Sequence, residues 1–520
     1  MRKNIKFWWI FPFLIFGAGF YSVLVRFAKG LGASTHLSDR FPWGLWVGFD
    51  VMCGVALAAG AFTLSAAVYV LHLDRYKPLV RASILTGFIG YLLAIAGLMV
   101  DLGHPYRIWH PLIMWNPHSV MFEISWCVTL YTLVLAMEFS AFLFEKLRWG
   151  KSTNAARTIT VPLVIMGVLL STLHQSSLGS LFLIVPYKLH PLWYSPWLPI
   201  FFFSSALALG CAMVIVESFA SSKVFKKELE LKILSDIGRV LVVALAVYAV
   251  ARAIDLFDRG ALNLALVPGF ERSMFLAEVL LAPIGPLILL LMPMVRANRF
   301  GLFMGASMTV VGFILNRFNV SMTGLIRSSE TKYFPSWMEI SVTFALVALG
   351  LVLFGLAVKY LNIFPLAKPC LSEGQTCTDK PSCCLPTGPR LLIAVFWVAA
   401  LTLIFNGIQD FRRFQPKDIG NAEVSVKSVN DKPRDYSYLP KDLAFPRSEE
   451  SPGKVTFSHD SHLLVAEKCT DCHGKQLGIL PGRAPRATDM HSAENCGRCH
   501  NGKAAGDECL SCHKGDVSAK

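Results

Sequence analysis

The chain has 520 residues, of which 54% are hydrophobic and only 16% are charged. Soluble globular proteins carry about 25% charged residues, so this composition excludes that class and indicates a protein of the bilayer. The formal net charge of +14 does not indicate nucleic-acid binding, because no basic run with interleaved aromatic residues occurs. In a membrane protein the positions of Lys and Arg matter more than their sum.

Eleven apolar segments are long enough, or nearly so, to cross a hydrocarbon core. The first follows a basic start and resembles a secretory signal peptide. We expect it to be retained as a helix, because its apolar run exceeds a signal core and no small-x-small cleavage site follows. The segments are residues 7–25, 44–70, 82–100, 122–143, 159–185, 198–216, 240–254, 274–294, 302–322, 340–360 and 391–405.

Three Cys-x-x-Cys-His motifs follow one another near the end of the chain. Each is a c-type haem attachment site, in which two thiols bond the porphyrin and the adjacent imidazole reaches the iron. A zinc ribbon would explain the Cys pairs but not the His after every pair. The motifs contain Cys469, Cys472 and His473, then Cys496, Cys499 and His500, then Cys509, Cys512 and His513.

Three other histidines lie in the same segment: His459, His462 and His491. Six imidazoles therefore match three irons that have two axial positions each. Met490, beside His491, is an alternative ligand that would raise the potential of its haem. The sequence thus predicts three covalently bound c haems with histidine ligands on both faces.

The haem motifs also predict the orientation of the chain. The resemblance to c-type cytochromes implies haem attachment on the outer side of a bacterial inner membrane, so we expect a periplasmic tail and, with eleven spans, a cytoplasmic N-terminus. The loops predicted as cytoplasmic independently carry most of the basic residues, as the positive-inside rule requires. Those residues are Arg75, Lys77, Arg81, Lys146, Arg148, Lys151, Arg157, Lys223, Lys226, Lys227, Lys232, Arg239, Arg296 and Arg299.

Ionisable groups within the spans gather toward the predicted outer leaflet, and the loop between the third and fourth spans is the richest in them. A quinol, the hydrophobic two-electron and two-proton carrier, needs acid–base groups for its hydroxyls and an aromatic slot for its ring. Alternatively, the aromatic residues form an interfacial belt and the carboxylates cap helices or form ion pairs. The candidates for a quinone site are Asp50, Asp101, His104, Arg107, His118 and Glu123.

The remaining cysteines fall into two groups. Cys53, Cys127 and Cys211 lie singly in apolar segments, where a thiol behaves as a small hydrophobic group. The other four, Cys370, Cys377, Cys383 and Cys384, share the proline-rich loop 362–389. Their spacing lacks the paired Cys-x-x-Cys of zinc and iron–sulfur sites, so we expect a plain cytoplasmic loop and keep a metal site as the alternative.

Residues 40 to about 365 resemble the quinone-interacting membrane subunits of the NrfD and polysulfide-reductase C class, and more closely its ten-helix branch of hydrogenase-2-type b-subunits. The resemblance is carried by residues 44–54, 101–105 and 109–119. It implies a menaquinone or menaquinol site near the outer face and no haem b in the membrane. It also implies electron exchange with periplasmic c-type cytochromes or a ferredoxin-like iron–sulfur subunit.

Residues 453–520 resemble the triheme cytochrome c7 module, which is similar to the tetrahaem class III cytochromes with one haem missing. The resemblance is carried by residues 455–462 and by His491. It implies that His459 pairs with His473, His462 with His500 and His491 with His513 as axial ligands. The eleventh span and the tail depart from the usual membrane subunit, which relies on a separate partner.

We therefore expect an all-α polytopic membrane protein with a small haem-cored cytochrome domain. The expected function is electron transfer between menaquinol and periplasmic carriers in anaerobic respiration. The alternatives are a non-catalytic anchor for a periplasmic hydrogenase or molybdoenzyme, and an ion-translocating device coupled to quinone redox chemistry. The expected parts are the membrane domain 1–365, the cytoplasmic loop 366–389, the eleventh helix 390–409, the periplasmic linker 410–452 and the cytochrome domain 453–520.

The cytochrome domain should not fold without its haems. From residue 455 onward the chain has a single aromatic residue, Phe457, which is too little apolar material for an ordinary core. A variant with all six haem-bonding cysteines replaced by Ala should lose this domain to limited proteolysis, whereas the haem-loaded chain should keep it. A haem-free domain that resists the protease would contradict this.

Overall fold

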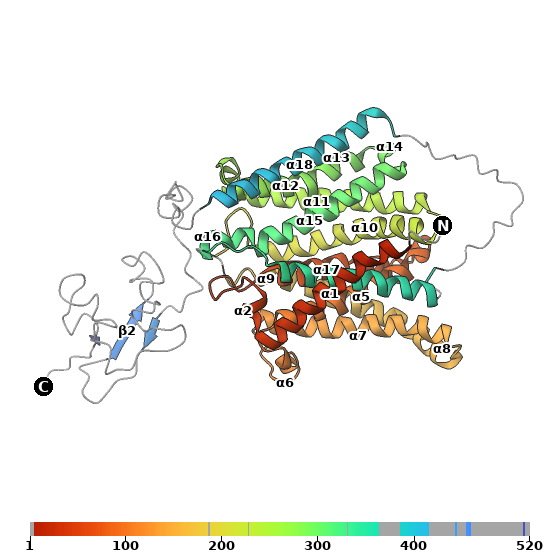
Figure 1. The fold of residues 1–520 in the computed structure, drawn as a ribbon, viewed down its shortest axis with the longest axis horizontal. Helices are drawn as coiled ribbons and strands as arrows, with labels where there is room; N and C mark the ends of the chain where they lie inside the picture. Colours follow the sequence, from red (N-terminus) through yellow and green to blue (C-terminus); the bar gives the residue numbers. More distant parts are fainter. Residues whose placement is uncertain are drawn as a thin grey trace, which may run out of the picture. The chain divides into compact units, whose positions relative to one another are not determined.

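A computed structural model describes residues 5–185, 188–226, 228–329, 331–361, 363–364, 385–414, 442–444, 454–458 and 513–514. The chain divides into two compact units, Met1–Glu423 and Val424–Lys520. The first unit is a bundle of helices that lie side by side along one direction (Figure 1). Its arrangement decides which of the predicted site residues meet.

Within the described residues, ten helical segments are long and apolar enough to cross a membrane. They coincide with ten of the predicted spans, and the remaining prediction, residues 7–25, lies within helix α1 (Ile5–Lys29). The uninterrupted α-helices among the ten are α5 (Lys77–Asp101), α7 (Val120–Lys146), α9 (Thr160–Ser180), α10 (Leu198–Phe225), α11 (Leu231–Asp258), α15 (Arg299–Ser321), α17 (Trp337–Tyr360) and α18 (Thr387–Arg413).

Two spans contain turns of π-helix, which widen the helix locally and often mark functional regions. The span 46–70 consists of η1 (Trp46–Cys53), α3 (Gly54–Leu57), α4 (Gly60–Ser65) and η2 (Ala66–Val70). The span 270–291 consists of α12 (Phe270–Val279), η6 (Leu280–Ile284) and α13 (Gly285–Leu291).

Short helices lie between the spans. They are α2 (Leu31–Ser34), η3 (Asp74–Tyr76), η4 (Pro105–Arg107), α6 (His110–Ile113), α8 (Gly150–Thr158), η5 (Ala261–Leu266), α14 (Pro293–Arg296), η7 (Thr323–Leu325) and α16 (Ile326–Ser329).

Several helices extend beyond the predicted spans because charged residues at their ends find partners. Helix α11 begins nine positions before the predicted start at residue 240. Its first turns contain Asp236, which accepts ion pairs from Arg75 at 3.1 Å and from Arg239 at 3.0 Å. Apolar content alone underestimates such a helix, because the helix continues into the interfacial region after its apolar run ends.

The helices of the bundle alternate in direction, so its two ends carry different loops (Figure 1). We name them by one loop each, the 102–119 end and the 71–76 end. Helix α18 finishes at the 102–119 end, where the Lys332 Nζ donates a hydrogen bond to the Arg412 carbonyl at 3.1 Å. Phe411 and Phe414 also pack on Phe270 there, with ring centroids 5.7 Å and 5.4 Å away.

The second unit contains three short strands, β1 (Asp442–Ala444), β2 (Lys454–Ser458) and β3 (His513–Lys514), in the order β1-β2-β3. Both neighbouring pairs are antiparallel, and Val455 of β2 lies opposite His513 of β3. The strand β1 lies inside the segment predicted as a linker. The four cysteines of the loop 362–389 lie outside the described residues, whereas Cys53, Cys127 and Cys211 are buried free thiols as predicted.

A close crossing of α15 and η6 gives a test of the packing. A Cβ added at Gly312 would lie 2.3 Å from the Ala282 nitrogen and 2.4 Å from the Leu281 carbonyl carbon. Because backbone atoms cannot yield as a flexible side chain can, Gly312→Ala should cost about 2 kcal/mol or more of stability. At Gly355, in α17, nothing lies within 4 Å of the added Cβ. Gly355→Ala should therefore leave the melting temperature in detergent unchanged or higher, and equal losses would contradict the crossing.

His190, in the loop between α9 and α10, makes the stability depend on pH. Its Nδ1 accepts a hydrogen bond from the Leu192 N–H at 3.2 Å, which requires the neutral ring. Burial lowers the pKa of His190 from 6.5 to about 4, with Glu271 raising it and Arg327 lowering it. Because the unfolded chain binds this proton more readily, stability should fall as the pH drops from about 6.5 toward 4.

The expected loss is about 2 kcal/mol between pH 7 and pH 5. In His190→Asn, the amide oxygen can accept the same hydrogen bond without titrating, so the melting temperature should fall less over this range. His72→Asn, at an exposed position with φ 54° that Asn tolerates, is the control. Identical pH dependence in wild type and His190→Asn would contradict the prediction.

Candidate functional site

Two of the predicted quinone residues, Asp50 and Asp101, lie together inside the 102–119 end of the bundle. Asp50 is 6% exposed and accepts a hydrogen bond from Thr343 Oγ1 at 2.8 Å. Its Cβ packs against Gly97, where an added Cβ would lie only 2.6 Å away. Asp101 follows Gly97 by about one helical turn, and the two carboxylates are close enough to interact electrostatically.

Asp101 differs from Asp50 in having a free oxygen. Its Oδ1 is buried and has no hydrogen-bond partner among the described residues. Arg26, at the end of α1, is 3% exposed and holds the backbone beside it. Arg26 Nε donates to the Val100 carbonyl at 2.6 Å, and its Nη2 donates to the Leu102 carbonyl. The guanidinium therefore stabilises the end of α5 and places a positive charge near Asp101.

Glu339, a fully buried carboxylate at the same end, accepts hydrogen bonds on both of its oxygens. Its Oε1 accepts from the Tyr333 hydroxyl at 2.5 Å, and its Oε2 accepts from the backbone N–H groups of Ser336 at 2.6 Å and His36 at 3.3 Å. Burial and the Glu339 carboxylate raise the pKa of Tyr333, which keeps that hydroxyl a donor. Glu339 is not among the site residues predicted from the sequence, although Ser336 and Glu339 have the spacing of a capping box.

The other predicted residues are more accessible. His104, Arg107 and His118 are exposed in the loop 102–119, where the Arg107 guanidinium lies 5.6 Å from the centre of the Tyr106 ring. Glu123 is exposed at the start of α7 and accepts a hydrogen bond from Ser177 Oγ at 2.7 Å. The structure thus joins Asp50 to Asp101 and leaves the remaining candidates near the surface of that end.

A second buried group connects α7 and α9 through α5. The Tyr91 hydroxyl and His174 Nδ1 are 3.0 Å apart, and the Tyr131 ring meets Tyr91 edge-on. Four polar atoms in this group are buried without a hydrogen-bond partner among the described residues, namely Tyr131 Oη, Ser171 Oγ, His174 Nε2 and Gln175 Oε1. Such a concentration of unpaired atoms is typical of a site that holds ordered water.

A third buried network fixes α12 to α15. The Glu278 carboxylate accepts hydrogen bonds from Trp193 Nε1 at 2.8 Å, Asn316 Nδ2 at 2.7 Å and Asn319 Nδ2 at 2.8 Å. Arg317 donates to Asn316 Oδ1 at 2.8 Å, and its guanidinium lies 3.9 Å from the centre of the Phe202 ring. With its oxygens occupied, Glu278 is held as a structural group.

The predicted haem ligands lie outside the described residues, except for the backbone of His513 in β3. The donor set suits the chemistry of c-type haem, because each thiol pair is followed by an imidazole and three more imidazoles are present. The pairing of Val455 with His513 also brings the segment before His459 beside the third attachment motif. The donor set of the sequence therefore fits the predicted cofactor in composition.

Comparison with known proteins supports this description of both parts. Residues 33–328 match the family model for polysulphide reductase, NrfD. Residues 455–514 match the model for cytochrome c7 and related cytochrome c. The resemblances and the fold class predicted from the sequence are thereby confirmed.

The matches to three relatives each extend over most of the relative's own length. A protein of Nitratidesulfovibrio vulgaris (strain Hildenborough) is 40% identical over 64% of this chain and 88% of its own. The probable Ni/Fe-hydrogenase 2 b-type cytochrome subunit of Escherichia coli (strain K12) is 33% identical over 69% of this chain and 93% of its own.

The menaquinone reductase integral membrane subunit of Nitratidesulfovibrio vulgaris is 30% identical over 69% of this chain and 91% of its own. The segment matched by the NrfD family model, residues 33–328, contains both Asp50 and Asp101. The chain therefore belongs to the polysulphide reductase NrfD family and carries a c7-type cytochrome domain near its carboxyl end.

Proposed function

We propose that the protein oxidises menaquinol at the 102–119 end of its bundle and delivers the electrons to periplasmic c-type cytochromes or to an iron–sulfur partner. The observation that supports the proposal is the buried carboxylate of Asp50 together with the half-buried Asp101, whose Oδ1 is shielded from solvent, at the end where α18 also finishes. Because the cytochrome domain follows α18 in the chain, the bundle presents its acid–base groups at the end from which that domain continues.

Quinol oxidation removes two protons and two electrons from the ring hydroxyls, so a base must stand where each hydroxyl loses its proton. Asp101 suits the first role, because its buried Oδ1 has no partner among the described residues. Asp50 is held by Thr343 and would act in support of it. His104, His118 and Glu123 are more exposed and would pass the released protons to the surface, with Arg107 beside them.

The cytochrome domain would hold three c haems through Cys469, Cys472, Cys496, Cys499, Cys509 and Cys512. Axial ligands would come from His459, His462, His473, His491, His500 and His513. When bound, these groups supply one-electron carriers that accept the two electrons of a quinol singly. The prediction that the membrane bundle binds no haem b also stays a proposal, and it stands beside a relative that is named a b-type cytochrome subunit.

In this proposal the 102–119 end faces the periplasm and the N-terminus lies in the cytoplasm. The basic residues of the predicted cytoplasmic loops support that orientation. The domain limits 1–365, 366–389, 390–409, 410–452 and 453–520 remain proposed, with β1 taken into the unit that holds the cytochrome domain.

The proposal is tested by quinol-dependent haem reduction in the purified protein. The double variant Asp101→Asn, His104→Ala should slow this reduction by about a hundredfold or more, because general-base catalysis contributes factors of that size. The variant Asp258→Asn, which changes an exposed carboxylate of α11, should react at the wild-type rate.

A wild-type rate in the double variant would remove these residues from the mechanism. Absence of any quinone-dependent haem redox change, together with a large periplasmic subunit that copurifies, would instead favour a non-catalytic anchor and haem relay. The relatives named as hydrogenase and menaquinone reductase subunits make that outcome the relevant alternative.

A further inference from the structure

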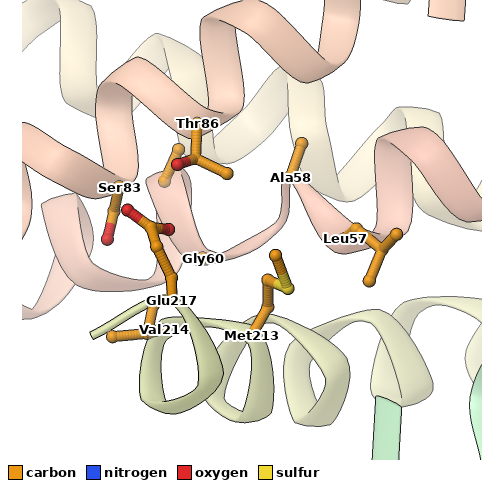
Figure 2. A pocket seen from close by; sticks show the side chains of 9 residues that line it. Leu57, Ala58, Gly60, Ser83, Thr86, Met213, Val214 and Glu217 are labelled. Atoms are coloured by element: carbon orange, nitrogen blue, oxygen red, sulfur yellow. The ribbon is translucent and has the colours of Figure 1, made fainter. Parts of the chain in front are cut away.

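A small cavity lies away from the quinone candidates, where α10 crosses the broken span 46–70 and α5. About 150 Å³ there is free of atoms, including space open to the outside, and none of it is wide enough to hold a water molecule. Figure 2 shows Glu217 of α10 extending toward Ser83 and Thr86 of α5. The remaining lining residues are Leu57, Ala58, Gly60, Ala61, Met213 and Val214.

Two oxygen atoms that face this cavity are buried and unpaired among the described residues. Glu217 Oε1 and Thr86 Oγ1 are buried, and neither has a hydrogen-bond partner among the described residues. Ser83 is 3% exposed and points a hydroxyl toward the same space. This differs from Glu278 and Glu339, whose carboxylate oxygens accept hydrogen bonds from several donors.

The cavity also lies well inside the bilayer. Thr86 is nine residues from the start of α5 and Glu217 is eight residues from the end of α10, which places both about 12–13 Å from the 71–76 end. A bare carboxylate at such depth is costly unless a positive charge compensates it. No Lys, Arg or His is among the residues that line the cavity.

The chemical type of these oxygen atoms limits which cation can supply the compensating charge. Carboxylate and hydroxyl oxygens are hard donors, which suit ions of the alkali and alkaline-earth type rather than soft metals. A single carboxylate balances one positive charge, so a divalent ion would leave a net charge buried. A proton would neutralise Glu217 and let it donate one hydrogen bond, to Thr86 or to Ser83, whereas a cation could contact both hydroxyl oxygens at once.

The span next to the cavity is interrupted, which is a second feature of ion sites in membranes. Helix α3 ends at Leu57 and α4 begins at Gly60, with Ala58 lining the cavity between them. Breaks of this kind at membrane depth are tolerated where the backbone lines a cavity. Turn-type hydrogen bonds, such as the one from the Ala61 N–H to the Ala58 carbonyl at 3.1 Å, replace the regular helical pattern here.

We propose that Glu217, Thr86 and Ser83 form a binding site for a dehydrated Na⁺ ion in the half of the bundle nearer the 71–76 end. The site is separate from the quinone candidates at the opposite end. Glu217 supplies the compensating charge, and the two hydroxyl oxygens of α5 supply neutral ligands. Binding of the ion joins α5 to α10 across the broken span.

The test uses a carbodiimide, which modifies protonated carboxyl groups in apolar surroundings. The haem-loaded, full-length protein is labelled in Na⁺-free buffer at fixed pH, and modification of Glu217 is followed by mass spectrometry of its peptide. NaCl should slow the modification by at least about tenfold, whereas choline chloride at the same ionic strength should not. Glu138, 9% exposed in α7, is the internal control and should react equally in both salts.

Variants then test the two hydroxyl ligands. Thr86→Val and Ser83→Ala should each raise the Na⁺ concentration that gives half-protection by about tenfold, because one ligand is lost. Thr86→Ser keeps the hydroxyl and should protect like the wild type. The haem spectrum and the elution profile of each variant show whether it has folded.

The proposal is overturned by any of three results. Modification of Glu217 that does not respond to Na⁺ would show a carboxyl that only binds protons. Equal protection by choline chloride, or protection of Glu138 as well, would show a general effect of salt. Absence of labelling in Na⁺-free buffer would show that the carboxyl is unavailable even without the ion.

Discussion

The bundle depends on one constraint, that a charge within a bilayer must find its partner inside the protein. Asp255 shows the usual solution: it is 6% exposed, forms ion pairs with Arg252 and Arg259 at 3.4 Å and 2.6 Å, and accepts a hydrogen bond from Ser195 Oγ at 2.5 Å. Removing one partner of such a group leaves an uncompensated buried charge, which costs several kcal/mol. Among the described residues, a buried charge held in this way is part of the structure.

Because of this constraint, a carboxylate that is incompletely paired is a candidate for a functional site. Glu278 and Glu339 have donors on both oxygens, so neither has a vacant position for a substrate hydroxyl. Asp101 and Glu217 each retain a buried oxygen without a partner among the described residues. An unpaired oxygen at membrane depth persists only if a ligand, water, ion or proton completes it. The two groups lie toward opposite ends of the bundle, which separates their proposed roles.

The sequence predicted the helices well because apolar length is a strong signal, and it predicted the haem domain from motifs whose spacing the chemistry requires. It also selected Asp50 and Asp101, since a carboxylate in an apolar segment is rare enough to stand out. It could not rank them against Glu123 or His104, because burial and pairing depend on contacts between segments far apart in the chain. The hydrogen bond from Thr343 to Asp50 joins residues 293 positions apart.

The role of Arg26 also depends on contacts between distant segments, which the sequence alone does not show. In the sequence Arg26 is only a charge that follows the first apolar segment, whereas the structure places it against the carbonyl groups at the end of α5, near Asp101. Helices α1 and α17 pack on each other, and both contribute residues to the 102–119 end. Both helices lie outside the segment 33–328 that the family model matches. Helices α1 and α17 therefore hold the candidate site in place, through Arg26 beside Asp101 and Thr343 bonded to Asp50.

The covalent attachment of the cytochrome domain has a physical consequence for the proposed electron transfer. A separate partner must diffuse to the membrane subunit, whereas a tethered domain is present at an effective concentration on the order of millimolar. In the proposal the bundle holds no haem that could carry electrons through its thickness, so the tether has to start at the end where the quinol gives up its electrons. Helix α18 meets this requirement: its Arg412 carbonyl contacts Lys332 at the 102–119 end. On the predicted topology a chain with ten spans would leave the bundle at the 71–76 end, whereas the eleventh predicted span, α18, returns it to the 102–119 end, where Asp50 and Asp101 lie.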